Sequence, residues 1–381
     1  MKFSVIIVHY NAPEFLWLTL DSVTKAVEGK NAEIIVADNA SKNFPADDFK
    51  KAFPGVRFLI FEKNSGFGRA NNEAVAQARG QYIFLINPDV VVPENLFDRL
   101  LPDMEQHPER GITGIRLFDG RGQFLPESKR NIPGFLNSFL KLFPVVPVRF
   151  IPFFKPYYNT SISAESSGEN PVFVGAFMGF ERRKFIETGG FDTRYFMYGE
   201  DIDLSYTFLR NGWKNFYRGD IGALHFKGES TPKTKKYQKH FVEATLLFQE
   251  KYHPFLHPFV KPLIKKMFAL KFRRETKQSP KNRRRNLPVF YAGKRTDILN
   301  RLNELYENIT ATTTPENIPY PCLIIFDAET FSYGEMLDFM WNNREKGYYY
   351  RFIPRQADFL LGSDSATGKG EIRYFSGKKK K

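Results

Sequence analysis

Four short runs of apolar, often β-branched residues most constrain the fold of this 381-residue chain. The runs are residues 3–8, 34–37, 56–61 and 82–86. Runs of this kind, apolar at most positions, are typical of parallel strands buried on both faces. Between the first two runs, apolar residues recur at helical spacing over residues 12–27. Between the last two runs lies an alanine-rich stretch, residues 67–79. The alternation predicts a doubly wound, mostly parallel α/β sheet.

Ligands of such sheets bind at the carboxyl ends of the strands, so polar residues that follow a strand are the candidate site. Tyr10 and Asn11 follow the first run, and Asp38 follows the second. We expect Asp38 to accept a hydrogen bond from a pyrimidine N–H, and Asn11 to hold the ribose. An Asx turn that leads into a helix is the alternative explanation for Asp38.

A glycine-containing turn, residues 64–72, opens a helix directly after the third run. Gly66 lets the backbone approach a ligand, and the free N–H groups of the helix start attract an anion or a hydroxyl. Asn64 and Asn72 flank this turn. We therefore expect Asn64, Gly66 and Asn72 to face a bound ligand.

Asn87-Pro88-Asp89 follows the fourth run. A carboxylate at the end of a buried strand is unstable unless it is paired or bound to a metal, and oxygen ligands suit Mg²⁺ or Mn²⁺ that bridges a diphosphate. We predict that Asn87 and Asp89 lie where the metal and the diphosphate meet, with Asp89 as a metal ligand. A helix cap is the alternative.

Two further clusters lie in the second half of this region. Glu200, Asp201 and Asp203 fall within four residues, and capping of a helix accounts for one of them but not for three. Crowded carboxylates raise one another's proton affinity, which favours a base that deprotonates an acceptor hydroxyl. His225 follows a short apolar segment and is equally consistent with an Mn²⁺ ligand and with a core histidine.

In this order, the clusters resemble glycosyltransferase family 2, with its GT-A fold, over residues 2–252. The family usually carries Asp-x-Asp where this chain has residues 87–89, so Asn87 replaces the first Asp and Asp89 becomes the principal carboxylate ligand. This variant resembles rhamnosyltransferase-like members. The resemblance also implies that Asp38 reads the pyrimidine and that His225 completes the metal site.

The same resemblance implies a reaction. It assigns the catalytic base to Asp201 and the positioning of the acceptor to Glu200, with Gly175, Ala176 and Asp203 on the acceptor or diphosphate side. It implies inverting transfer, with Mn²⁺ or Mg²⁺, from a dTDP- or UDP-sugar. The acceptor is expected to be a hydroxyl of a saccharide or of a polyprenyl-linked glycan in cell-surface synthesis.

The net charge of +14 is concentrated near the C-terminal side. Residues 251–286 contain 12 Lys or Arg and one Glu, and residues 378–381 are all Lys. Since the chain also holds 40 Phe and 18 Tyr, we expect an anionic membrane surface as a partner, and no nucleic acid. The short apolar run at the N-terminus does not predict a signal peptide, and the single Cys322 fits a reducing compartment. The expected location is cytoplasmic, peripheral at the inner face of the membrane.

The sequence predicts a transferase domain over 1–252 with an aromatic insertion at 132–160. A basic, aromatic, membrane-proximal segment and linker follows at 253–286, then a small α/β domain of unknown role at 287–377, then the Lys tail at 378–381. Two alternatives remain open. One is a nucleotidyltransferase, which normally has a basic glycine-rich loop after the first strand. The other is a membrane- or nucleic-acid-binding module with a degenerate transferase domain.

Overall fold

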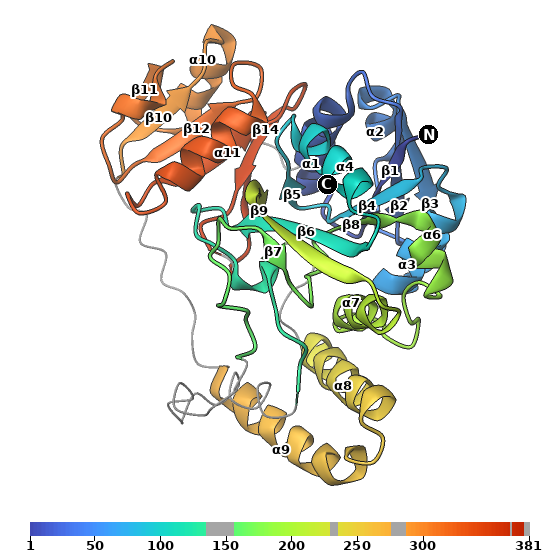
Figure 1. Ribbon diagram of the computed structural model, residues 1–381. Helices are drawn as coiled ribbons and strands as arrows, with labels where there is room; N and C mark the ends of the chain where they lie inside the picture. The colour runs from blue at the N-terminus through green and yellow to red at the C-terminus, as the bar shows by residue number, and fades with distance from the viewer. Residues whose placement is uncertain (135–155, 229–234, 276–286, 366–367, 377–381) are drawn as a thin grey trace.

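The computed structural model describes residues 1–134, 156–228, 235–275, 287–365 and 368–376 (Figure 1). Most of the aromatic insertion predicted at 132–160, the end of the 253–286 segment and the Lys tail at 378–381 lie outside the described residues. The described chain forms two sheets with their helices.

The first sheet is the doubly wound, mostly parallel sheet that the sequence predicts. Its strands are β1 Phe3–His9, β2 Ala32–Asp38, β3 Val56–Ile60, β4 Tyr82–Ile86, β5 Val90–Val91, β6 Arg110–Phe118, β7 Gly168–Glu169, β8 Phe177–Glu181 and β9 Lys214–His225. The order is β3-β2-β1-β4-β8-β6-β9-β5, with β7 paired to β9. Strands β1 to β4 are parallel, whereas β8 runs antiparallel to β4 and β6. The fold-class prediction is confirmed.

Helices cover both faces of this sheet because successive side chains of a strand point to opposite sides. The helices are α1 Pro13–Val27, α2 Ala46–Ala52, α3 Phe67–Gln77, α4 Leu96–Gln106, α6 Arg182–Glu187 and α7 Glu200–Arg210. Val5 and Ile7 of β1 pack in one core with α1, α2 and α4. Ile6 and Val8 pack in the opposite core with α3, α6 and α7.

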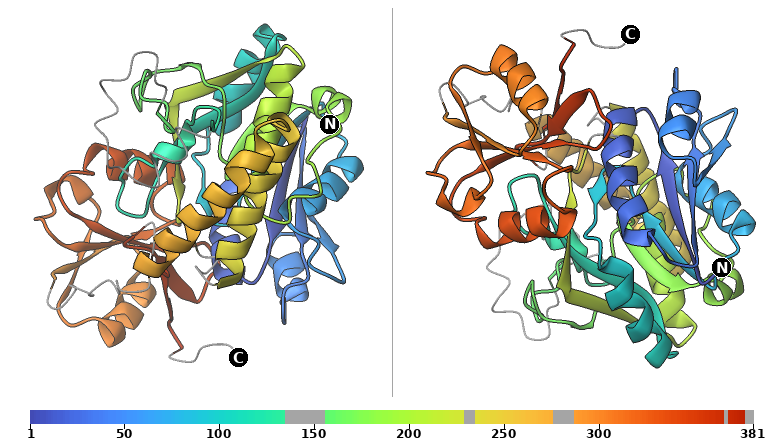
Figure 2. Two further views of the ribbon diagram at one scale, coloured as in Figure 1. Left: turned by 90° about the horizontal axis from the view of Figure 1, so that it is seen from below. Right: turned by 90° about the horizontal axis from the view of Figure 1, so that it is seen from above.

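Two long helices, α8 Lys235–Tyr252 and α9 His257–Glu275, form a hairpin below the first sheet (Figures 1 and 2). Their aromatic rings meet at Phe241 and Phe268, whose centroids are 5.4 Å apart. The sequence predicts a basic helix from Lys261, whereas α9 begins at His257 and continues through Pro262. No helix in the described part of the chain is long and apolar enough to cross a membrane.

The second sheet contains β10 Val289–Ala292, β11 Ile309–Thr312, β12 Leu323–Asp327, β13 Tyr349–Ile353, β14 Phe359–Gly362 and β15 Glu371–Tyr374. Its order is β11-β10-β12-β13-β14-β15, and the first four strands are parallel. Helices α10 Thr296–Leu305 and α11 Tyr333–Asn342 connect them. Strands β14 and β15 extend the sheet by antiparallel pairing, and β11 forms the opposite edge.

The two sheet units share one hydrophobic core. Phe15 and Leu18 of α1 and Phe226 after β9 are buried together with Tyr333 and Trp341 of α11. Glu94, which precedes α4, accepts hydrogen bonds from the backbone N–H groups of Tyr333 at 2.7 Å and Gly334 at 2.8 Å. The first unit therefore supplies the acidic group that neutralises the N-terminus of α11.

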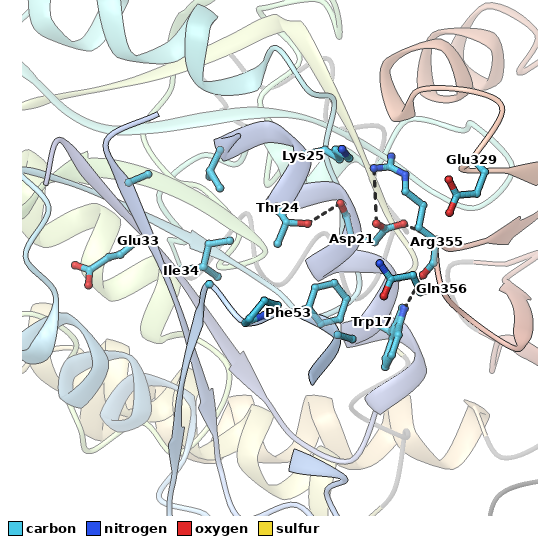
Figure 3. Close-up of a pocket in the computed structure, with 15 residues that line it drawn as sticks. Trp17, Asp21, Thr24, Lys25, Glu33, Ile34, Phe53, Glu329, Arg355 and Gln356 are labelled. Atoms are coloured by element: carbon cyan, nitrogen blue, oxygen red, sulfur yellow. Dashed lines mark hydrogen bonds and ion pairs between the residues drawn. The ribbon is translucent and has the colours of Figure 1, made fainter. Parts of the chain in front are cut away.

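A cavity of about 490 Å³ lies at this junction (Figure 3). Trp17 and Asp21 of α1 and Arg355 beyond β13 line it, and the Trp17 indole N–H donates to the Arg355 carbonyl at 3.1 Å. Residues 32–34 at the start of β2 complete one wall. Since the candidate residue Asp38 is at the other end of β2, this cavity is not the predicted site.

Candidate active site

Asp38 is buried at the carboxyl end of β2, beside His9 at the end of β1. The Nδ1 of His9 lies 2.7 Å from Oδ1 of Asp38, and the Ser41 N–H donates to Oδ2 at 3.0 Å. Burial raises the pKa of Asp38, but the hydrogen bonds from His9 and Ser41 outweigh it, so this pKa lies below its ordinary value. Both carboxylate oxygens are engaged by the protein, and contact with a pyrimidine stays a prediction.

Tyr10 and Asn11 lie beyond the end of β1, at the surface. Asn11 adopts a left-handed conformation with φ 53°, and its side-chain carbonyl accepts a hydrogen bond from the Lys42 N–H at 2.8 Å. The Asn11 N–H donates to the Ser41 hydroxyl at 2.8 Å. The loops after β1 and β2 are thus joined to each other, next to the buried Asp38.

The turn at the start of α3 is fixed by its own side chains and by a distant loop. Asn64 accepts hydrogen bonds from the Gly66 N–H at 3.0 Å and from the Asn39 amide at 3.2 Å. Gly66 has φ 90°, and a Cβ at this position would lie 2.4 Å from the Phe196 carbonyl oxygen. Only glycine fits here, because the loop that precedes α7 covers the turn.

Asn72 bonds to the same loop with both ends of its amide. Its Nδ2 donates to the Phe191 carbonyl at 2.8 Å, and its Oδ1 accepts from the Phe191 N–H at 2.9 Å. Asn72 therefore joins α3 to this loop. Its predicted contact with a nucleotide sugar stays a prediction.

Asp89 and His225 come together because β5 pairs with the end of β9, which places Val90 opposite His225. Both side chains are buried, and Oδ1 of Asp89 lies 3.4 Å from Nε2 of His225. That oxygen makes no hydrogen bond to the described residues, and neither does Nδ1 of His225. An unsatisfied buried carboxylate is costly, so this pair fits a divalent cation that accepts oxygen and imidazole ligands.

The protein part of such a metal site is small. Within the described ranges, no three His, Cys, Asp or Glu side chains gather as a metal-binding group. Asn87, at the end of β4, donates its backbone N–H to the Ala176 carbonyl at 2.9 Å. That bond brings the Asp89 turn beside residues 175–176, so the predicted donor and acceptor sides adjoin.

Three carboxyl groups begin α7, after Gly199 in a left-handed conformation with φ 82°. Asp201 forms a buried ion pair with Arg130, whose Nη2 donates to Oδ2 of Asp201 at 2.6 Å. The Gly175 N–H donates to the same oxygen at 3.1 Å. The Asp201 carboxylate is therefore held between a guanidinium and a backbone amide.

Glu200 meets a different environment. Its side chain is buried, and Oε2 has no hydrogen-bond partner among the described residues. Burial, followed by the negative charge of Asp201, raises the pKa of Glu200 to about 8. At neutral pH the Glu200 carboxyl is largely protonated.

Asp203 contacts α8. Lys251 donates to Oδ2 of Asp203 at 2.9 Å, and the Tyr252 hydroxyl donates to Oδ1 at 2.8 Å. Burial is the largest influence on Asp203 and raises its pKa. These contacts join α7 to α8, while the predicted place of Asp203 on the acceptor or diphosphate side stays a prediction.

Sequence reasoning missed Arg130 and Glu127. Both lie in the segment from η1 (Pro126–Ser128) to residue 134, which shows no strand or helix periodicity. Arg130 pairs with Asp201, and Glu127 forms an ion pair with Lys227, two residues beyond His225. Since both partners are distant in the sequence, no local pattern marks either pair.

Comparisons with known proteins converge on one group of enzymes. Residues 4–189 match the model of glycosyl transferase family 2. The chain is 29% identical over 242 residues to N-acetylglucosaminyl-diphospho-decaprenol L-rhamnosyltransferase of Mycobacterium tuberculosis, covering 60% of this chain and 76% of that protein. It is 27% identical over 223 residues to rhamnosyltransferase WbbL of Escherichia coli, covering 54% and 79%.

Among solved structures, similarity extends to the mannosyltransferase PcManGT of Pyrobaculum calidifontis in complex with GDP-Man and Mn²⁺. The match covers 73% of this chain and 76% of that protein, with 15% identity and a TM-score of 0.45.

Proposed function

The chain belongs to glycosyltransferase family 2, and on that premise we propose that it transfers a sugar, with inversion, from a dTDP- or UDP-sugar to an acceptor hydroxyl in cell-surface glycan synthesis. One observation supports the proposal most directly. The buried Asp89 carboxylate faces His225, and its Oδ1 makes no hydrogen bond to the described residues. Asp201, at the start of α7, is ion-paired with Arg130.

Asp201 is the proposed catalytic base. The Arg130 guanidinium and the Gly175 N–H hold its carboxylate in one orientation, which suits a group that accepts the proton of the acceptor hydroxyl. As the acceptor oxygen bonds to the anomeric carbon, the acceptor proton moves to Asp201 and the nucleoside diphosphate leaves. We propose that Glu200, whose pKa is raised to about 8, donates a hydrogen bond to an acceptor oxygen.

Asp89 and His225 would hold a divalent cation, Mn²⁺ or Mg²⁺. Such an ion neutralises charge on the leaving diphosphate. We propose that Asn87, Asn64, Gly66, Asn11 and Tyr10 line the donor side of this ion.

A lipid-linked saccharide is the proposed acceptor. The name of the Mycobacterium tuberculosis relative states that it acts on a decaprenol-linked substrate, and 12 Lys or Arg against one Glu between residues 251 and 286 suit an anionic membrane. We propose that the enzyme works at the inner face of the membrane, from the cytoplasm.

A thermal-shift screen of dTDP-, UDP- and GDP-sugars, with and without Mn²⁺, identifies the donor. We expect Mn²⁺-dependent stabilisation by one donor, and loss of that dependence in Asp89→Ala. Asp201→Asn should bind the donor as wild type does and lose transfer by at least about 100-fold. Donor binding that is indifferent to Mn²⁺ and to Asp89 would refute the metal site, and retained turnover in Asp201→Asn would refute the base.

A further inference from the structure

We propose that the turn between α8 and α9 and the first half of α9 form a docking surface that inserts into an anionic lipid membrane. The inference deepens the proposed function, since it names the part of the chain that meets the membrane. Four apolar side chains, here called the apolar tip, are exposed in this turn and on α9. Their exposed fractions are 90% for Phe255, 57% for Leu256, 78% for Phe259 and 43% for Leu263.

Phe255 and Leu256 lie in the turn that precedes α9, and Phe259 and Leu263 lie on α9 itself. The spacing i, i+4 of Phe259 and Leu263 places them in one stripe along the helix, which the turn residues precede. Ile264 and Phe268, on the other side of α9, are buried, and the Phe268 ring contacts Phe241 of α8. The core contact of α9 is therefore already made by its opposite side, and the stripe is left to meet a partner outside the chain.

Positive charge surrounds the apolar tip. Lys261, Lys265 and Lys266 are exposed on the same helix, and the sequence from 253 to 266 contains no Asp or Glu. An exposed stripe of large apolar side chains beside lysines is typical of helices that lie in the interface of an anionic bilayer. The aromatic rings insert among the acyl chains, while the lysines remain at the level of the phosphates.

A membrane fits this surface better than either alternative occupant. Nucleic acid would contact the lysines, but it offers no apolar phase for Leu256 and Leu263. A second copy of the chain would cover the apolar tip, yet a symmetric contact would bring two clusters of lysines against each other.

The surface is also connected to the candidate active site. Phe255 is three residues beyond Tyr252, whose hydroxyl donates to Asp203 at 2.8 Å. Asp203 is on α7, two residues from Asp201. Figure 1 shows α8 and α9 together on the side of the first sheet where α7 lies and away from the second sheet. A membrane bound at the apolar tip is thereby linked through α8 to the helix that carries the proposed base.

The test is sedimentation of the full chain with vesicles, in the absence of donor and acceptor. We expect binding to phosphatidylcholine vesicles that contain roughly one third phosphatidylglycerol, and much weaker binding to phosphatidylcholine alone. The double variant Phe255→Ser, Phe259→Ser should weaken binding about tenfold or more. Replacing Lys261, Lys265 and Lys266 by Gln should weaken it about fivefold per lysine, and high salt should do the same to wild type.

Matched controls remove exposed side chains elsewhere. Ile60→Ser with Ile186→Ser, at 51% and 59% exposure, controls for loss of apolar surface. Lys50, Lys51 and Lys63, all exposed, changed to Gln control for loss of charge. Both control proteins should bind vesicles as wild type does. Equal binding by the Phe255, Phe259 variant and wild type would overturn the proposal, as would equal losses in the controls.

Two further measurements separate this inference from its alternatives and from the proposed reaction. Light scattering on the same variants tests self-association, and a gel shift tests nucleic-acid binding. If the variants lost only self-association or only nucleic-acid binding, and kept vesicle binding, the membrane assignment would be overturned. Transfer to a water-soluble acceptor should be unchanged in the Phe255, Phe259 variant. Since vesicle binding needs no catalysis, an inactive wild type would refute the proposed reaction and leave the docking result intact.

Discussion

Glu200 and Asp201 are adjacent in the sequence, but their carboxyl groups meet different surroundings. Asp201 is paired with Arg130 and the Gly175 N–H, whereas Oε2 of Glu200 is buried without a partner in the described structure. The difference follows from direction, because successive residues of a helix point about 100° apart. Asp201 is thereby held by two hydrogen-bond donors, while the carboxyl group of its neighbour Glu200 has its pKa raised to about 8.

The first prediction concerns the pH dependence of stability. The folded-state pKa of Glu200, about 8, is above its ordinary value of 4.5, so its contribution to stability is complete below 4.5 and is lost as the pH rises through 8. Glu200→Gln does not titrate. The variant should therefore gain stability over wild type with rising pH, by on the order of a few kcal/mol above pH 8. Thermal unfolding from pH 5 to 9 measures this, with the exposed Glu62→Gln as the control that should show no trend.

The second prediction concerns Arg130. Arg130→Met leaves the buried Asp201 carboxylate without its cation and should lower the free energy of unfolding by about 3–5 kcal/mol. In the protein that still folds, kcat should fall about tenfold or more while donor affinity stays near that of wild type, because the proposed base is no longer held in position. Arg130→Lys, which keeps the charge, should lose less. An unchanged kcat in folded Arg130→Met would show that Arg130 only supports the fold.

At the scale of elements, Asp203 of α7 is the polar contact between α7 and α8 that Lys251 and Tyr252 complete. Lys251 of α8 bridges Asp203 at 2.9 Å and Asp192 at 3.0 Å, and its side chain is 26% exposed. Asp203 is thus used in helix packing. The helix hairpin that carries the apolar tip is attached at this same contact.

The third prediction tests that attachment. Lys251→Met should cost about 1.5–3 kcal/mol, since it leaves the buried Asp203 with tyrosine hydroxyls as its donors. Hydrogen exchange across residues 235–252 should accelerate, while donor affinity stays as in wild type. Lys239→Met, at an exposed position of the same helix, is the matched control. Unchanged exchange in Lys251→Met would mean that α8 is held by its apolar contacts alone.

At the scale of the whole molecule, the two sheet units are joined by a shared core and by polar contacts. Tyr333 donates its hydroxyl to Asp21 at 2.5 Å, and the Arg355 N–H donates to the same carboxylate at 2.8 Å. Burial is the main reason that the pKa of Asp21 is raised. Such a junction favours a single cooperative unit over two independent ones.

The fourth prediction follows from the junction. Calorimetry of the full chain should show one unfolding transition, because separating the units exposes Phe15, Leu18 and Phe226. Glu94→Ala removes the acceptor at the start of α11 and should lower stability by about 1–2 kcal/mol. Glu304→Ala, exposed on α10, should have little effect. Two separate transitions in wild type would show that the units fold independently.

The sequence by itself determined strands β1 to β4, helices α1 and α3 between them and the strand-end positions of Asp38 and Asp89, because apolar periodicity reports burial within one element. The sequence also contains, in order, the five polar clusters that resemble the family. The tertiary structure alone decided which partner each polar residue meets. Arg130 reaches Asp201 across 71 positions and Lys251 reaches Asp203 from another helix, and the docking of the second unit depends on contacts more than 200 positions apart. Such partners are set by packing, which no local spacing encodes.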